Sequence, residues 1–317
     1  MRVVITGAAG FLGQRLAAAI CDRGLVADAS GERRQPSGIV LLDQVAAPLE
    51  GAPFVVATGD VCDANVVAEA ITPETRSVFH LAAVVSAAAE ADFDLGMAVN
   101  LDATRLILER CREIGTCPRL VFVSSVAAFG GSGGTVDGET ANRPLNSYGA
   151  QKAICELLIN DYTRKGFVDG RAVRLPTIIV RPGRPNRAAS SFASSILREP
   201  LNGERAICPV SDNLQIWVAS PGAAVDGLMH AHDLAADALS GWRTFNLPGL
   251  GVTVREMVDA LVAQGGDASL IDWQRDESIE RIVGTWPAHI ETPAEETLGF
   301  PSDSSLASIV AQYVAER

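Results

Sequence analysis

The chain has 317 residues, of which 48% are hydrophobic and 20% charged, a composition typical of a folded globular protein with one large core or two lobes. Its formal net charge of −12 disfavours contact with phosphate backbones and anionic lipids, so we expect neither nucleic acid nor a membrane as a partner. The six scattered cysteines form no CxxC pair and the chain opens on no charged, apolar leader, which predicts a cytoplasmic protein without disulfides or a bound metal.

Short apolar segments alternate with longer helical ones over the first 180 residues. Strands are predicted at 2–6, 39–43, 54–60, 77–83, 119–125 and 172–180, and helices at 11–23, 63–71, 95–114 and 146–165. Nearly all residues of the strands are apolar, as expected for strands that are buried on both faces. The pattern therefore predicts an α/β fold, a Rossmann doubly wound parallel sheet.

The pattern becomes less regular after residue 180. The stretch "RPGRPNRAASSF" (181–192) has the composition of a loop. It is followed by two short strands, "RAICPV" and "QIWVAS", and by helices near 223–240, 253–265 and 303–316, with the segment "TFNLP" between the first and second of these helices. We expect a first domain over 1–180 and a smaller C-terminal α/β substrate lobe over 181–317, from which some segments return to the first domain. Such a lobe would close over a ligand at the carboxyl ends of the strands.

The segment "TGAAGFLG" joins the first strand to the first helix. Gly7 permits a tight turn, Gly10 allows a pyrophosphate to approach the backbone, and Gly13 allows close helix packing. The spacing is GxxGxxG rather than GxGxxG, but its position predicts a dinucleotide site. Phe11 and Leu12, within the same turn, are expected to line it.

The ends of the later strands supply further predicted cofactor contacts. Asp43 ends "IVLLD", where a carboxylate would bind the adenosine ribose and repel a 2′-phosphate, so NAD is favoured over NADP. Arg33 and Arg34 keep NADP open as an alternative. The remaining predicted contacts are Asp60, Val61, Leu81, Ala82, Ala83, Pro176 and Thr177. We expect His80 to be a buried, hydrogen-bonded histidine rather than a catalytic group.

The segment "NSYGAQKAICE" (146–156) places a tyrosine four residues before a lysine. Tyr148 and Lys152 would lie on one helix face. An ammonium group favours the phenolate, so Lys152 is expected to lower the pKa of Tyr148 and make it a general base. Ser125 ends the fifth strand and would orient the substrate oxygen, whereas Ser124 points to the other side.

Several stretches together resemble the extended short-chain dehydrogenase/reductase family: "TGAAGFLG", "FHLAA", "VNLDAT", "FVSSVAAFG" and "SYGAQK". The resemblance implies NAD bound by the Rossmann domain and a catalytic set of Ser125, Tyr148 and Lys152. It also implies a structural or proton-relay role for Asn100. Members usually dimerise through two helices, here 95–114 and 146–165, so we expect a homodimer.

Within that family, longer stretches such as "ASSFASSILREPLNGE" and "FNLPGLGVTVREM" resemble the subgroup that oxidises D-erythronate. The implied reaction is NAD-dependent oxidation of the hydroxyl next to the carboxylate of this four-carbon sugar acid. The substrate contacts expected at the strand ends and in the following loop are Ser86, Ser125, Tyr148, Thr177, Asn186 and Arg187. Arg181 and Arg184 are further candidates for the carboxylate.

Three other functions stay open on the sequence. A uronate dehydrogenase would act on a related sugar acid. A nucleotide-sugar epimerase or dehydratase would recycle its NAD and release no net NADH. A non-catalytic dinucleotide sensor is an alternative of a different class, although sensors tend to lack the Tyr–Lys pair.

Overall fold

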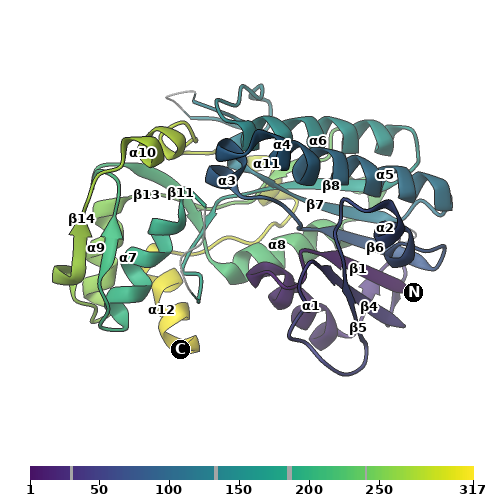
Figure 1. The fold of residues 1–317 in the computed structure, drawn as a ribbon, viewed down its shortest axis with the longest axis horizontal. Helices are drawn as coiled ribbons and strands as arrows, with labels where there is room; N and C mark the ends of the chain where they lie inside the picture. Colours follow the sequence, from purple (N-terminus) through teal and green to yellow (C-terminus); the bar gives the residue numbers. More distant parts are fainter. Residues whose placement is uncertain (29–30, 132–134, 184–187, 240) are drawn as a thin grey trace.

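A computed structural model describes residues 1–28, 31–131, 135–183, 188–239 and 241–317 (Figure 1). A sheet of seven strands, all parallel to their neighbours, forms the larger part of the molecule. Its spatial order is β5 (Phe54–Thr58), β4 (Gly38–Asp43), β1 (Arg2–Thr6), β6 (Thr75–His80), β7 (Arg119–Ser125), β8 (Asp169–Leu175) and β12 (Thr244–Asn246). The strand order reverses direction between β1 and β6, which is where doubly wound sheets bind ligands. The predicted fold class is confirmed.

Helices cover both faces of this sheet (Figure 1). One face packs against α1 (Phe11–Arg23) and α8 (Pro221–Asp233), and the other against α2 (Ala64–Ala70), α5 (Ala103–Ile114) and α6 (Ser147–Arg164). Successive side chains of β1 point to opposite faces of the sheet. Val3 and Ile5 therefore belong to the core of the first face, and Val4 belongs to the core of the second.

Two predicted elements differ in detail from the observed ones. The helix predicted at 95–114 is α4 (Phe93–Gly96), a π-helical segment η1 (Met97–Asp102) and α5. The strand predicted at 172–180 divides into β8 and β9 (Thr177–Ile178). The division lets the chain leave the large sheet at its carboxyl edge, because β9 pairs with β11 of the smaller lobe.

The smaller lobe has its own apolar core. Its elements are the sheet β13 (Leu250–Thr253), β11 (Gln215–Ala219) and β9, the pair β10 (Ala206–Cys208) and β14 (Ile271–Trp273), and the helices α7 (Ser191–Leu201), α9 (Val254–Ala263), α10 (Glu277–Val283) and α12 (Leu306–Glu316). The sequence did not predict α7. Its start falls in the stretch interpreted as a loop, yet Phe192, Ile196 and Leu197 bury one apolar face in the core of the lobe.

The remaining elements are short. They are the hairpin β2 (Val26–Ala27) and β3 (Arg33–Arg34), α3 (Ser86–Ala91), α11 (Pro293–Thr297) and the 3₁₀ turns η2 (Val126–Ala128), η3 (Ala236–Ala238) and η4 (Ala268–Leu270). Both α8 and β12 lie beyond residue 180 but pack on or pair with the large sheet. The domain boundary at 180/181 stays a prediction. None of the helices in the described ranges combines the length and apolar character that a bilayer span requires.

Candidate active site

The glycine loop takes its shape from close backbone packing. Gly7 has a φ of +71°, and a Cβ there would lie 2.7 Å from the Ala82 nitrogen. A Cβ on Gly13 would lie 2.3 Å from the Gly7 oxygen. No side chain caps the following helix, whose N-cap is Gly10. The loop therefore presents open backbone and the positive end of α1, which suits a phosphate group.

Two cavities meet at this loop. The first, of about 290 Å³, is lined by Gly7, Gly10, Phe11, Leu12, Gly13, Leu81, Val85, Ser86, Val123, Ser124, Ser125, Val126, Tyr148, Leu175, Pro176, Thr177, Ile178, Arg181, Ala188, Ser190 and Trp286. The second, of about 330 Å³, is lined by Gly7, Gly10, Leu42, Asp43, Gln44, Val61, Leu81, Ala82, Ala83, Val84, Leu95 and Val99. Gly7, Gly10 and Leu81 border both, so an extended ligand crossing the loop would reach both cavities.

Asp43 lies where a ribose contact was predicted. Its carboxylate accepts a hydrogen bond from the Ala9 backbone nitrogen at 3.0 Å and lines the second cavity. Val61 is buried against the same cavity. Asp60 lines neither of the two cavities; its carboxylate is exposed and accepts from the Cys62 nitrogen at 2.9 Å.

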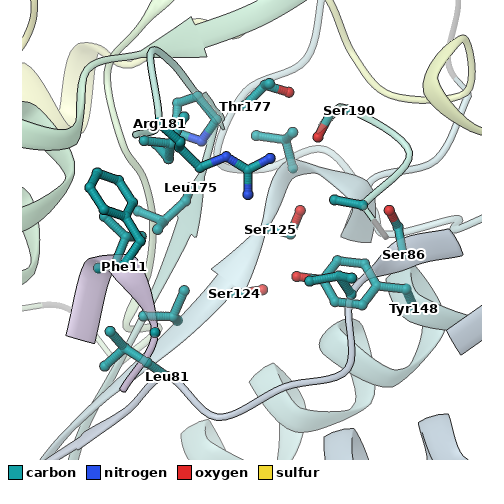
Figure 2. Close-up of a pocket in the computed structure, with 18 of the residues that line it drawn as sticks. Phe11, Leu81, Ser86, Ser124, Ser125, Tyr148, Leu175, Thr177, Arg181 and Ser190 are labelled. Carbon is teal, nitrogen blue, oxygen red and sulfur yellow. The ribbon is translucent and has the colours of Figure 1, made fainter. Parts of the chain in front are cut away.

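The two serines that end β7 have different environments. The Ser124 hydroxyl is buried and donates to Glu156 at 2.5 Å. Glu156 in turn pairs with the buried Arg174 at 2.8 Å. The Ser125 hydroxyl accepts from the Ala127 nitrogen at 3.2 Å and faces the first cavity (Figure 2). Ser125 is therefore the serine available to a ligand, as the alternation along the strand predicted.

The start of α6 brings Tyr148 beside Ser125. The N-cap Asn146 accepts a hydrogen bond from the Gly149 nitrogen at 2.8 Å. A Cβ on Gly149 would lie 2.3 Å from the Ala127 oxygen, so only glycine lets the helix lie this close to the turn after β7. Ser125 and Tyr148 both line the first cavity, and the Ser125 hydroxyl acts to lower the pKa of Tyr148. The contribution of Gly149 escaped the sequence analysis, although a glycine inside a helical pattern is a signal of close packing.

Lys152 is fully buried one turn further along α6. Its ammonium donates to the Val123 carbonyl at 2.8 Å and lies 4.4 Å from the centre of the Phe122 ring and 5.6 Å from that of Tyr148. Burial lowers the pKa of Lys152 to about 8. The ammonium lies beneath the site, and Lys152 is absent from the residues that line the first cavity.

The pKa of Tyr148 is raised to about 12, mainly because burial penalises the phenolate, and the hydrogen bond with Ser125 offsets this only in part. The predicted lowering of this pKa by Lys152 is therefore wrong for this structure. The reason is that desolvation of the phenolate raises this pKa by more than the neighbouring groups lower it.

Two further polar residues beneath the site are fully hydrogen-bonded. Asn100, in the π-helical segment, accepts from the Val84 nitrogen at 2.8 Å and donates to the Val84 oxygen at 3.0 Å and to Gln151 at 2.7 Å. It holds the segment after β6 and does not line the first cavity. His80 lies between the hydroxyls of Thr6 at 2.6 Å and Thr104 at 3.0 Å, so the prediction of a buried, hydrogen-bonded histidine is confirmed.

The smaller lobe and α3 complete the walls of the first cavity. Ser86 is buried, and its hydroxyl accepts from the Ala189 nitrogen at 3.1 Å. Ser190, Thr177 and Arg181 line the same space (Figure 2). Trp286 also lines it, and no local pattern in its sequence could have predicted this. The predicted contacts Asn186 and Arg187, and the candidate Arg184, lie outside the described residues.

The described ranges contain no cluster of three or more His, Cys, Asp or Glu side chains that could hold a metal ion. The residues that line the first cavity present hydroxyl groups, a phenol and a guanidinium to a ligand, and the ammonium of Lys152 is buried beneath them.

Comparisons with known proteins found chains that are similar over nearly the full length. The model of the NAD dependent epimerase/dehydratase family matches residues 3–239. D-erythronate dehydrogenase of Cupriavidus necator is 51% identical over 100% of this chain and 98% of its own, and that of Haemophilus influenzae is 46% identical over 99% of both. A crystal structure described as a nucleoside-diphosphate-sugar epimerase from Agrobacterium tumefaciens is 38% identical, covers 100% of this chain and 94% of its own, and has a TM-score of 0.90.

Proposed function

The chain belongs to the NAD dependent epimerase/dehydratase family, and from this we propose that it is an NAD-dependent dehydrogenase that oxidises D-erythronate at the hydroxyl next to the carboxylate. The two D-erythronate dehydrogenases aligned over the full length support the substrate. The single structural observation that supports the chemistry most is that Ser125 and Tyr148 line one cavity, which also borders the glycine loop.

The residues of the loop and of the second cavity suit NAD. We propose that Gly7, Gly10 and the start of α1 hold the pyrophosphate and that Asp43 binds the adenosine ribose. Phe11, Leu12, Gly13, Val61, Leu81, Ala82, Ala83, Pro176 and Thr177 would surround the rest of the cofactor, with Asp60 at the adenine end. When bound, NAD supplies the hydride acceptor and, in its oxidised form, a positive charge beside the reacting groups.

The protein groups would divide the remaining work. Ser125 orients the substrate hydroxyl, and the phenolate of Tyr148 takes its proton as the C–H electron pair leaves as hydride. Lys152, whose ammonium lies 5.6 Å from the centre of the Tyr148 ring, is proposed to add positive charge near the phenolate, although not enough to offset its desolvation, and to hold the nicotinamide ribose. Asn100 positions the segment after β6 through Val84. Ser86, Thr177, Asn186 and Arg187 are proposed to contact the rest of the sugar acid.

A nucleotide-sugar epimerase is the second candidate, because the Agrobacterium structure carries that description at 38% identity. An epimerase returns the hydride to its substrate, so it releases no net NADH. A dehydrogenase releases one NADH for each acid oxidised. The two functions therefore differ in stoichiometry.

Absorbance of NADH should be followed with purified protein, either NAD or NADP, and a panel of four- to six-carbon sugar acids. We expect stoichiometric NADH with D-erythronate, less with uronates, and a strong preference for NAD because Asp43 repels a 2′-phosphate. If NAD were reduced stoichiometrically with a uronate but not with D-erythronate, the protein would instead be a uronate dehydrogenase. Epimerised nucleotide sugar without NADH would support the second candidate.

We also propose a homodimer formed through α5 and α6. Ile154 and Leu157, one turn apart on α6, are 40% and 58% exposed, although apolar residues of this size are usually buried. Light scattering of the wild-type protein is expected to give the mass of two chains. Leu157→Arg, which puts a charge on that face, should give the mass of one chain; an unchanged mass for this variant would place the interface elsewhere.

A further inference from the structure

One charged side chain, that of Arg181, stands among the described residues that line the first cavity. Figure 2 shows its guanidinium projecting into the space that Ser125 and Tyr148 face from the opposite side. The other polar side chains on the wall are neutral: the Trp286 indole and several hydroxyls, including those of Ser86, Thr177 and Ser190. The combination of one cation and several hydroxyl groups matches a small polyhydroxylated anion.

The backbone of Arg181 is held in place by α7. Its nitrogen donates to the Ser194 hydroxyl at 3.1 Å, and its carbonyl accepts from the Arg198 guanidinium at 2.6 Å. Ser194 and Arg198 are both buried. The side chain of Arg181 therefore extends from a fixed point of the lobe, so little entropy is lost there when a ligand binds.

The charge of Arg181 has no acidic partner among the described residues, whereas its neighbour Arg198 pairs with Glu199 at 2.5 Å. Burial, and then the positive charge of Arg198, lower the pKa of Arg181. A guanidinium nevertheless stays protonated in proteins. In a chain with a net charge of −12, a largely buried cation left without a carboxylate indicates that an anionic ligand supplies one.

We propose that Arg181 binds the carboxylate of the substrate and thereby presents the adjacent hydroxyl to Ser125 and Tyr148. This rests on the proposed function and deepens it by naming the residue that selects acids over neutral polyols. Because the carboxylate is anchored opposite the reacting pair, the hydroxyl next to it is the one oxidised. Two parallel N–H···O bonds from the guanidinium would fix that orientation.

The test compares D-erythronate with its neutral amide, D-erythronamide, in wild type and Arg181→Met. Loss of a charge-assisted contact should raise KM for the acid roughly 10- to 100-fold while the amide is affected little, so the preference for the acid falls. Arg181→Lys keeps the positive charge but not the planar guanidinium with its two parallel donors, so it should restore part of the preference for the acid. Arg205→Met, an exposed arginine of the same lobe, is the matched control and should leave the preference unchanged.

Two results would overturn the proposal. One is an equal loss for acid and amide in Arg181→Met, which would indicate a structural role. The other is an unchanged preference in that variant together with its loss in Arg187→Met, which would transfer the carboxylate contact to Arg187. Calorimetric titration with D-erythronate separates this proposal from the proposed function. If the wild type binds the acid without oxidising it, the proposed function fails. Weaker binding by Arg181→Met would then still support the contact between Arg181 and the carboxylate. If the wild type does not bind the acid, both fail.

Discussion

Replacing Tyr148 by phenylalanine is expected to lower kcat for D-erythronate by roughly 10²- to 10⁴-fold, the usual contribution of a general base. Tyr148 is half-buried and lines the same cavity as Ser125, so the variant keeps the ring and loses only the hydroxyl group. Binding of NADH, measured by its fluorescence, should change little because the glycine loop is untouched. The rate of oxidation by the wild type should rise with pH in the alkaline range, since a phenol with a pKa raised to about 12 must ionise to act.

Tyr162→Phe is the matched control for this experiment. Tyr162 lies on the same helix, but its hydroxyl contacts Glu109 on the outer side, away from the cavity. The Tyr162→Phe variant should therefore keep the kcat of the wild type. If Tyr148→Phe kept more than a tenth of the wild-type kcat, a different residue would have to be the base.

Replacing Lys152 by methionine is expected to lower turnover at least about 100-fold and yet to stabilise the fold at pH 7. The ammonium is fully buried, and its pKa falls from 10.5 to about 8 on folding. Above pH 8 the folded protein holds fewer protons than the unfolded chain, so wild-type stability should rise between pH 8 and 10.5. Below pH 8 the full cost of the buried charge, on the order of 3 kcal/mol, remains.

The methionine side chain has a similar length and no charge, so it removes this cost but leaves the Val123 carbonyl without its donor. A net gain of about 1–2 kcal/mol in the free energy of unfolding at pH 7 is therefore expected, measured by urea denaturation. The rise in stability from pH 8 to 10.5 should be absent in the variant. Lys165→Met, at an exposed position just after α6, should preserve both the rise and the activity. The expectation would be contradicted if Lys152→Met were less stable than wild type at pH 7 and its stability still rose from pH 8 to 10.5. Burial of the Lys152 charge would then not destabilise the fold.

The sequence by itself determined the fold class and most of the glycine loop. Apolar runs such as "RVVIT" are strands buried on both faces, and this requirement is local and periodic. Gly7 and Gly13 were identified because only glycine tolerates the backbone contacts after β1. The Tyr148 and Lys152 spacing likewise depends only on the helix repeat.

Only the tertiary structure decided what lies around those groups. The helix α7 was hidden by loop-forming residues at its start and forms because its apolar face is buried in the smaller lobe. The high pKa of Tyr148 depends on burial by distant segments, and the sequence-based expectation of a lowered pKa failed for that reason. Arg181 is one of several candidate arginines in the sequence, and only the folded chain shows that its side chain lines the cavity that Ser125 also faces, with no acidic partner among the described residues. Pairing, burial and desolvation are set by residues far apart in the chain, so no local pattern records them.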